Sequence, residues 1–441
     1  MRKRHQPRRQ QQPLPLNLPV KRYTVTGLTH EAKGVARLEG KVAFIDGALP
    51  GEVVDAQLTK VHKSYDQAEL TTLIEPSAER ITPPCPHYQQ CGGCSFQHMS
   101  EHQQLSAKQH WLRGQLRKVL AAERPLDILN DQAYGYRRRA RISVYVKDGR
   151  VLLGFRAKGS KHITPIDNCL VLSSPLQRLY QALKQQLLAD PLAADIGHVE
   201  LLDDDAGLSV LLRVIKPLAA ASESRWQDWA AQQGCQLYWQ HANEARAAVA
   251  DADRRYYQVE GLRLSYHPQD FIQVNSAMND KMVAQALNWL KLNAQDVVLD
   301  LFCGVGNFTV PLAKQAKQVI GVEVQESMVQ AGRDNARANG LSNVSFIAAD
   351  LTQPLQAELD QLGVTKVLLD PPRAGAYEFL ANIVKLNPQQ ILYVSCDAAT
   401  LARDAEFLVE QGFEVIRVTM MNMFPQTSHV ETMMLLSRKA N

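Results

Sequence analysis

Cys396 is the residue that the sequence places best for covalent chemistry. It lies in the segment Tyr-Val-Ser-Cys-Asp, directly after the apolar run 391–394, which is typical of a buried strand. About 90 residues earlier, a glycine-rich turn occupies 300–307. Since α/β enzymes keep nucleophiles and nucleotide-like ligands beyond the carboxyl ends of strands, we interpret Cys396 as a nucleophile. The alternative is a small buried thiol that only packs.

The glycine-rich turn, Asp300-Leu-Phe-Cys-Gly-Val-Gly-Asn307, predicts a cofactor that approaches the backbone closely. Glu323 ends the next apolar run, where a carboxylate can accept both hydroxyls of a ribose. Asp350 ends the third run and can reach an adenine amino group. The turn alone is compatible with NAD, FAD or S-adenosylmethionine. A missing third glycine and the strand pattern at the end of the chain favour S-adenosylmethionine.

Asp370-Pro-Pro-Arg373 opens an alternative chemistry. It resembles the loop with which amino-methyltransferases hold a planar nitrogen, but an arginine replaces the usual aromatic residue. An enzyme of that kind needs no cysteine. Cys396 therefore discriminates between methylation of carbon and methylation of nitrogen.

Four other cysteines have the spacing of a ligand set. Cys85, Cys91 and Cys94 form C-x5-C-x2-C, and Cys169 follows at a distance. An iron–sulfur cluster, a zinc ion and unligated thiols all remain open from the spacing, although paired C-x2-C knuckles would suit zinc better. An odd total of seven cysteines argues against a disulfide framework.

The elements that must position these residues change character along the chain. From residue 271 on, apolar runs at 297–302, 319–324, 344–348, 367–370 and 391–394 alternate with helical stretches, which predicts a doubly wound parallel sheet. Two further runs, 413–421 and 430–436, are joined by a short return. They predict an antiparallel terminal strand, as in class I methyltransferases.

The first 270 residues predict three other parts. Residues 1–19 are rich in Arg, Gln and Pro and indicate a flexible arm; 20–80 indicate a small five-stranded, OB-like barrel. A Cys-rich loop and a helix over 102–120 follow. Runs at 198–203, 208–215 and 262–266, with a hairpin about Asp148-Gly149, indicate a mostly antiparallel central domain over 81–270.

Composition and charge narrow the class of protein. The chain has 441 residues, 45% of them hydrophobic and 21% charged, which indicates a folded, soluble protein of two or three domains. We expect a cytoplasmic protein, since the sequence offers neither a membrane span nor a signal peptide. The net charge is only +4, but basic residues cluster near the start and at 137–141. Such clusters suit a polyanion.

Taken together, six motifs resemble the RNA uracil-5-methyltransferase family, in its branch that carries a TRAM barrel and an iron–sulfur cluster and acts on 23S rRNA. The resemblance covers nearly the whole chain and rests on the four cysteines, 271–275, 300–307, 370–373, Ser395-Cys396 and His429-Val-Glu431.

This resemblance implies a class I S-adenosylmethionine-dependent methyltransferase domain over 271–441 and a [4Fe–4S] cluster on Cys85, Cys91, Cys94 and Cys169. It implies a cofactor and base pocket lined by Gln273, Phe302, Asn307, Glu323, Asp350 and Asp370. The expected partner is 23S rRNA, with the protein a monomer. Pro372 stands where a small Ala is common in the family, and Asp350 stands where an amide also occurs.

The chemistry of that family needs two side chains with different tasks. A thiolate must add to C6 of uracil, which gives C5 carbanion character, and a base must later remove the C5 proton. Cys396 fits the first task and Glu431 the second, and the resemblance gives both those roles. Three alternatives stay open: Glu431 as a solvated carboxylate at a strand start, the same chemistry on another rRNA uridine or on tRNA, and the whole chain as a non-catalytic iron–sulfur RNA-binding protein.

Overall fold

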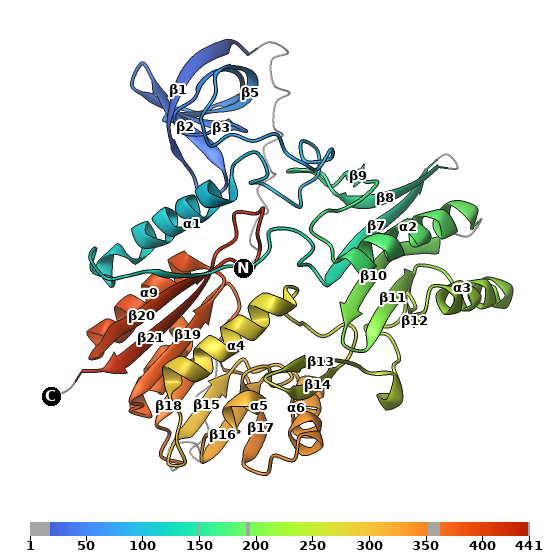
Figure 1. Cartoon of the computed structure of the whole chain (residues 1–441), viewed down its shortest axis with the longest axis vertical. Helices are drawn as coiled ribbons and strands as arrows, with labels where there is room; N and C mark the ends of the chain where they lie inside the picture. Colours follow the sequence, from blue (N-terminus) through green and yellow to red (C-terminus); the bar gives the residue numbers. More distant parts are fainter. Residues whose placement is uncertain (1–17, 148–149, 191–194, 352–361, 440–441) are drawn as a thin grey trace, which may run out of the picture. The chain divides into compact units, whose positions relative to one another are not determined.

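The computed structural model describes residues 18–147, 150–190, 195–351 and 362–439. The chain divides into two compact units, Met1–Pro83 with Ser95–Ala107, and Pro84–Cys94 with Lys108–Asn441. The Asp148-Gly149 turn and most of the expected arm lie outside the described residues. Figure 1 labels most of the helices and strands of the two units.

The first unit contains a closed barrel with strand order β1-β2-β3-β5-β4, which confirms the expected five-stranded barrel. Side chains alternate between interior and solvent along each strand, as on β4, where Val54, Ala56 and Leu58 are buried. Glu52, also buried, accepts hydrogen bonds from the Arg80 guanidinium and from the backbone of Leu49. The strands are β1 (Val20–Leu28), β2 (Lys33–Leu38), β3 (Lys41–Asp46), β4 (Val53–Val61) and β5 (Tyr65–Glu75).

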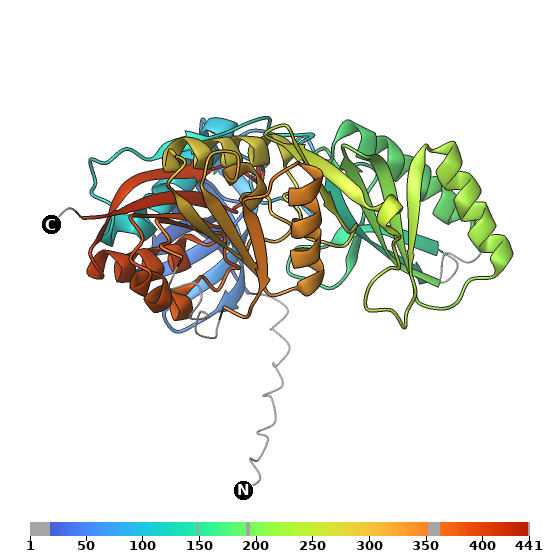
Figure 2. The same cartoon turned by 90° about the horizontal axis from the view of Figure 1, so that it is seen from below.

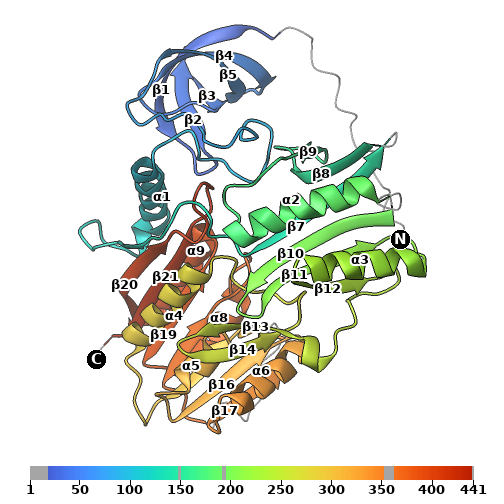
Figure 3. The same ribbon diagram turned by 45° about the vertical axis from the view of Figure 1, so that its right-hand side comes forward.

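In the second unit, a six-stranded sheet has the order β12-β11-β10-β7-β8-β9. All its pairs are antiparallel except β11 with β12, so the mostly antiparallel central domain is confirmed. Helices α2 (Ser174–Ala189) and α3 (Ala220–Gln232) pack on one face, as Figure 3 shows. The strands are β7 (Arg139–Lys147), β8 (Arg150–Arg156), β9 (Ile163–Pro165), β10 (Ile196–Asp204), β11 (Gly207–Val214) and β12 (Cys235–Gln240).

The second unit also contains an eight-stranded sheet of order β17-β16-β15-β18-β19-β21-β20-β6. Its first five strands are parallel, and β21 runs antiparallel between β19 and β20, as the class I pattern predicts. The strands are β15 (Val297–Leu301), β16 (Gln318–Glu323), β17 (Val344–Ala348), β18 (Lys366–Leu369), β19 (Gln390–Ser395), β20 (Phe413–Met421) and β21 (Glu431–Arg438).

Helices cover both faces of this sheet (Figure 2). They are α4 (Ser276–Leu290), α5 (Thr309–Leu312), α6 (Glu326–Ala338), α8 (Tyr377–Lys385) and α9 (Ala398–Glu410). A two-stranded sheet of β13 (Arg255–Val259) and β14 (Leu262–Tyr266) precedes α4. The remaining elements are α1 (Glu101–Gln115) and two short 3-10 helices, η1 (Leu116–Lys118) and η3 (Asp251–Asp253). Among the helices of the described residues, none has the length and apolar character needed to cross a bilayer.

The strand β6 (Asp127–Leu129) was not expected from the sequence. It lies within the range that we assigned to the central domain, yet it pairs in parallel with β20 and extends the large sheet at its edge. With only three residues, β6 has no detectable hydrophobic period. It forms because β20 offers an open edge.

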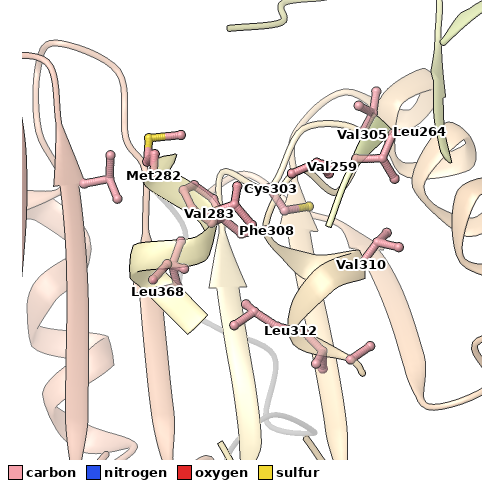
Figure 4. Packing of buried hydrophobic residues seen from close by; sticks show 14 of the residues in the cluster. Val259, Leu264, Met282, Val283, Cys303, Val305, Phe308, Val310, Leu312 and Leu368 are labelled. Carbon is pink, nitrogen blue, oxygen red and sulfur yellow. The ribbon is translucent and has the colours of Figure 1, made fainter. Parts of the chain in front are cut away.

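The core of the large sheet fixes the glycine-rich turn. Cys303, Val305 and Phe308 belong to one buried cluster, in which Phe308 lies near Val283 of α4 and Val305 near Val259 of β13 (Figure 4). Burying a side chain such as Phe308 contributes roughly 1.5–3 kcal/mol relative to leaving it exposed. Packing of these side chains therefore holds the turn in place.

Candidate active site

The parallel strands β15, β18 and β19 of the large sheet end at the same level. Leu301 pairs with Leu369, and Leu369 pairs with Tyr393, so the residues that follow β15, β18 and β19 lie along one edge. Asp370 directly follows the last residue of β18, and Cys396 directly follows the last residue of the neighbouring strand β19. The carboxyl edge of such a sheet is where α/β proteins bind ligands.

Cys396 and Glu431 meet at this edge. Ser395 of β19 pairs with Thr432 of β21, and the two candidate residues are their immediate neighbours at the same end of the pair. Glu431 is buried, with 9% of its surface exposed, whereas Cys396 is half-buried. The register thus brings together a thiol and a carboxyl group that are about 35 residues apart in the sequence.

Both groups are shifted toward their neutral forms, and Glu431 contributes to the shift of Cys396. Burial, followed by the nearby charges of Glu431 and Asp370, raises the pKa of Cys396 to about 11, and Arg373 opposes the shift. Burial and the charge of Asp370 raise the pKa of Glu431 to about 8, again opposed by Arg373. Without a ligand, the site therefore favours a thiol and a carboxylic acid at neutral pH.

The backbone after Cys396 is fixed by a helix cap. Asp397 is the N-cap of α9 and accepts hydrogen bonds from the backbone of Ala399 and Thr400, both at 3.0 Å. Ser395 Oγ accepts from the backbone N–H of Asp397 at 3.1 Å. The thiol is consequently held next to a helix N-terminus, where a thiolate is favoured by the helix dipole.

A buried carboxylate that the sequence analysis missed supports the loop after Asp370. Asp404 of α9 is fully buried and accepts hydrogen bonds from Tyr393 Oη at 2.6 Å and from the backbone of Ala376 at 2.8 Å. Gly375 has φ +77°, and a Cβ there would lie 2.6 Å from a carboxyl oxygen of Asp404. The signal available in the sequence was a charged residue on an otherwise apolar helix face, between Leu401 and Leu408.

The glycine-rich turn has the backbone expected of a ligand cradle. Phe302, Gly304 and Gly306 have φ values of +64°, +56° and +98°. Glu323 accepts hydrogen bonds from the backbone of Gly304 at 3.3 Å and of Gln325 at 3.0 Å, which orients its carboxylate at the edge. For a residue with a side chain, such as Phe302, a positive φ is uncommon and is typical of functional loops.

Asp300 lies in β15 directly before this turn, and its carboxyl group has a raised pKa. One carboxyl oxygen accepts a hydrogen bond from Thr309 Oγ1, whereas Oδ1 is buried and has no hydrogen-bond partner among the described residues. Burial, with the charges of Asp370 and Glu323, raises its pKa to about 7. Burial also raises the pKa of Asp370 to about 7. Several carboxyl groups that resist ionisation together suit a positively charged ligand.

Asn307 is held by two residues that the sequence analysis did not select. Its Oδ1 accepts hydrogen bonds from Tyr257 Oη at 3.0 Å and from Asn279 Nδ2 at 3.1 Å, and its own amide donates to Asn279 at 2.9 Å. Tyr257 comes from β13 and Asn279 from α4. The orientation of the Asn307 amide is therefore set from outside the turn.

Gln273 and Asp350 complete the set expected to line the pocket. The backbone carbonyl of Gln273 accepts a hydrogen bond from Arg138 Nε at 2.8 Å, and its side chain is half-buried. Asp350 is exposed and follows β17, the strand whose neighbour β16 ends at Glu323. The structure thus brings Asp350 to the same edge but gives it less enclosure than the others.

The expected cysteine ligands also approach one another. Cys85 and Cys91 belong to one loop, which is tied to the Cys169 segment because His87 accepts a hydrogen bond from the backbone of Asp167 at 3.0 Å. Burial, opposed by backbone hydrogen bonds and increased by the charges of Cys91 and Cys85, raises the pKa of Cys169 to about 11. Among the described residues, no group of His, Cys, Asp or Glu side chains is arranged to hold a metal ion.

The arginine cluster at 137–141 has mostly internal contacts. Arg138 is buried, and Arg139 pairs with Glu200 at 2.7 Å. Arg137 donates to the carbonyl of Arg139 at 2.8 Å. Arg141 alone among the four is exposed. These contacts give Arg138 and Arg139 a structural task that the sequence analysis, which expected phosphate contacts, did not foresee.

Comparison with known proteins places the chain among RNA-modifying enzymes. The family model described as tRNA (Uracil-5-)-methyltransferase matches residues 100–439, and the TRAM domain model matches 20–71. A relative from Marinomonas sp. (strain MWYL1), named 23S rRNA (uracil(1939)-C(5))-methyltransferase RlmD, is 57% identical over 441 residues, all of both chains. A relative of the same name from Aeromonas hydrophila is 41% identical and covers 95% of this chain and 96% of its own.

A solved structure shares the fold. It is the Pyrococcus abyssi tRNA (uracil-54, C5)-methyltransferase in complex with S-adenosyl-L-homocysteine, with a TM-score of 0.74 and 22% identity. The match covers 94% of this chain and 99% of that one.

Proposed function

Because the chain belongs to the tRNA (uracil-5-)-methyltransferase family, we propose that it transfers a methyl group from S-adenosylmethionine to C5 of a uridine in 23S rRNA. The observation that carries this proposal is the meeting of Cys396 and Glu431 at the carboxyl edge of the sheet. The choice of 23S rRNA rests on the relatives of that name, which match this chain over nearly their whole length.

In the proposed reaction, Cys396 loses its proton to solvent, and the thiolate Sγ forms a bond to C6 of the uracil ring as the electrons of the C5–C6 double bond move to C5. S-adenosylmethionine supplies an electrophilic methyl group, which C5 accepts as the bond from that methyl to the sulfonium sulfur breaks and S-adenosylhomocysteine is left. Glu431 then takes the proton from C5, and the electron pair of that C–H bond restores the C5–C6 double bond as the C6–S bond breaks. Cys396 leaves as the thiolate, and the product is 5-methyluridine.

The acidic edge of the sheet fits a cofactor that carries a positive sulfonium group. Asp300, Asp370 and Glu431 each have a raised pKa, so a nearby positive charge would favour their ionised forms. We propose that Gln273, Phe302, Asn307, Glu323, Asp350 and Asp370 line the cofactor and base pocket. An ionised Glu431 is the form that can accept the C5 proton.

We further propose that Cys85, Cys91, Cys94 and Cys169 hold a [4Fe–4S] cluster. Three observations support the fit. The backbone N–H of Gly93 donates to Cys91 Sγ at 3.4 Å, and backbone groups of Val171 and Leu172 favour charge on Cys169. A Cβ at Gly92 would lie 2.9 Å from the carbonyl oxygen of Arg156, so only glycine lets the loop approach β8. Such N–H···S contacts are the usual means of stabilising cluster thiolates.

A covalent trapping experiment tests the methyl transfer. The full chain is incubated with S-adenosylmethionine and a 23S rRNA transcript in which 5-fluorouridine replaces uridine. A fluorinated ring has no C5 proton to lose, so the adduct should persist and shift the protein on a denaturing gel. Cys396→Ala should abolish both the adduct and methylation of the ordinary transcript.

Two other outcomes would each overturn the proposal. Methylation retained in Cys396→Ala would point to a route without a covalent bond, such as methylation of nitrogen at the Asp370 loop. An absence of both adduct and product with the unaltered protein would favour a protein that only binds RNA.

A further inference from the structure

The glycine-rich turn is tied to the hairpin of β13 and β14 through side chains of both strands' neighbours. Tyr257 of β13 donates a hydrogen bond to Asn307 Oδ1 at 3.0 Å. On β14, the backbone N–H of Ser265 donates to Asn335 Oδ1 at 2.8 Å, and Asn335 Nδ2 donates in turn to the carbonyl of Val305 at 3.0 Å. The hairpin therefore fixes both a side chain and the backbone of the turn.

The side chain of Asn307 is held in one orientation. Its Oδ1 accepts two hydrogen bonds, from Tyr257 Oη and from Asn279 Nδ2, so both lone pairs of this oxygen are used. Its Nδ2 donates one N–H to Asn279 Oδ1 at 2.9 Å, and the second N–H has no acceptor within the described residues. Asn307 consequently has a donor, and no acceptor, to offer to a ligand.

Tyr257 is well placed to act as the donor in this contact. Its side chain is 2% exposed, and burial raises the pKa of its hydroxyl above the usual 10.0, so the hydroxyl keeps its proton. The guanidinium carbon of Arg138 lies 4.9 Å from the ring centroid, and the ring of Tyr266 lies at a centroid distance of 5.8 Å. Tyr266 and Arg255 both donate to Asp204 of β10, which anchors the hairpin.

The electrostatic surroundings of Asn307 differ from those of the acidic edge. Arg138 is buried beside Tyr257, and its Nη2 has no hydrogen-bond partner in the described part of the chain. Asp280 also acts on Tyr257, but burial raises the pKa of Asp280 and so favours its neutral form. An N–H donor close to a buried guanidinium suits a negatively charged acceptor.

The cofactor carries one strongly negative acceptor, the carboxylate of its methionine part. Glu323 suits the ribose hydroxyls and Asp350 the adenine amino group, because both carboxylates accept hydrogen bonds from donors of the ligand. Neither can hold another carboxylate, since like charges repel. The second N–H of Asn307 supplies the donor that this acceptor requires.

We propose that Tyr257 is a positioning residue for the cofactor. Together with Asn279 it occupies the carbonyl oxygen of Asn307, so that the amide turns an N–H toward the ligand and donates it to the carboxylate of S-adenosylmethionine. This inference rests on the proposed function. Without the hydroxyl of Tyr257, the two amides can rotate together and present the Asn307 oxygen, which would repel that carboxylate.

Two ligands that differ only in the carboxylate test the inference. They are S-adenosylmethionine and its decarboxylated form, and calorimetry on the full chain without RNA measures the Kd of each. Tyr257→Phe should weaken binding of S-adenosylmethionine about 5–10-fold, the effect of one hydrogen bond to a charged group. The decarboxylated ligand should bind to this variant as it binds to the unaltered chain, which also shows that the variant is folded.

The neighbouring tyrosine of the same strand is the matched control. Tyr256 lies on the other face of β13, where its ring contacts the guanidinium of Arg263 at 3.7 Å. Tyr256→Phe should bind both ligands as the unaltered chain does. Asn279→Ala, which removes the other donor to Asn307 Oδ1, should weaken S-adenosylmethionine selectively, as Tyr257→Phe does.

A double-mutant cycle tests whether Tyr257 acts through Asn307. In an Asn307→Ala background, Tyr257→Phe should cause no further loss of affinity, because the amide that it positions is already gone. In the methylation assay, Tyr257→Phe should raise the KM for S-adenosylmethionine and change kcat little. The carboxylate is bound equally in the ground state and in the transition state, whereas a disturbed fold would lower kcat as well.

Three outcomes would overturn the inference: equal weakening of both ligands by Tyr257→Phe, unchanged binding of S-adenosylmethionine, or a further loss in the Asn307→Ala background. Equal weakening would mean that Tyr257 only supports the fold of the turn. The trapping assay with 5-fluorouridine decides the proposed function separately. An unaltered chain that binds S-adenosylmethionine but forms no adduct would overturn the methyl transfer to uridine, whereas the cofactor contacts are measured without RNA.

Discussion

Lys108 Nζ donates a hydrogen bond to Asn422 Oδ1 at 2.7 Å, across more than 300 residues of sequence. The same ammonium group contacts the carbonyl of Phe424 at 3.1 Å. Asn275 Nδ2 donates to the carbonyl of Met423, and Tyr136 Oη to that of Pro425. The segment that leads from β20 to Glu431 is thus held by three side chains from earlier parts of the second unit.

Replacing Lys108 by Met should destabilise the protein by about 1–3 kcal/mol, because buried acceptors on Asn422 and Phe424 lose their donor. Urea unfolding measures the change. Lys118→Met is the control, since that exposed lysine pairs with Glu406 at the surface and should contribute at most about 1 kcal/mol.

The effect of Lys108→Met should also depend on pH. Burial lowers the pKa of Lys108 to about 7 from the 10.5 that is usual for a lysine. The unfolded chain then binds more protons between these two values, so the unaltered protein gains stability as pH rises through them, whereas the variant does not. The difference between the two proteins should be larger at pH 9 than at pH 6; a difference independent of pH would contradict the assignment.

Glu431→Gln should still methylate C5 but should turn over slowly, because an amide cannot take the C5 proton. We expect the covalent complex with ordinary, non-fluorinated RNA to accumulate on a denaturing gel. Glu414→Gln, at an exposed position of β20, should behave as the unaltered enzyme. Normal turnover by Glu431→Gln would remove this residue from the mechanism.

The same substitution should stabilise the ligand-free protein. The pKa of Glu431 is raised from 4.5 to about 8, so folding opposes its ionisation, and stability falls as pH rises between these values. Glu431→Gln should therefore raise the free energy of unfolding by about 1–3 kcal/mol at pH 8 and much less at pH 5. Thermal unfolding at both pH values provides the measurement, and equal gains at both would refute the shift.

Asp404→Asn should weaken the support of the Asp370 loop. The substitution removes the charge that accepts from Tyr393 and the backbone of Ala376 and that pairs with Arg403 at 2.7 Å. A loss of about 1.5–3 kcal/mol is expected, because the hydrogen bonds to a buried charged acceptor are weakened, whereas the half-exposed Arg403 contributes little. Glu406→Gln, on the exposed side of the same helix, is the control. If Asp404→Asn lowers the free energy of unfolding no more than this control does, Asp404 does not stabilise the loop.

Cys169→Ser should reduce the iron and acid-labile sulfide of protein purified without oxygen. The unaltered chain should contain about four of each, as a [4Fe–4S] cluster requires. Cys235→Ser, a half-buried thiol of β12 outside the proposed ligand set, should keep both. Zinc without sulfide in the unaltered protein would contradict the assignment.

Much of the fold was predictable because its signals are local. The apolar runs 344–348 and 413–421 coincide with β17 and β20, since a buried strand needs a continuous apolar segment. The strand β6 and the support from Asp404 were not predictable, because their partners lie far away in the sequence. Phe302 was selected from its motif, but its positive φ became visible only in the structure.

The same distinction applies to the site. The sequence identified Cys396 and Glu431 by type and motif, and the register of β19 with β21 explains why they meet. It gave no sign of Tyr257, Asn279 or Lys108, whose partners come from other elements. A residue whose role is to position another residue by a hydrogen bond belongs to no sequence motif that would identify it.

The last strand of the chain lies inside the large sheet, between β19 and β20, rather than at its margin. Synthesis proceeds from the N-terminus. The edges of β19 and β20 that pair with β21 therefore stay unpaired until β21 has been synthesised. Chains that stop before Glu431 should therefore be especially prone to aggregate, because both strands would keep an exposed, unpaired edge.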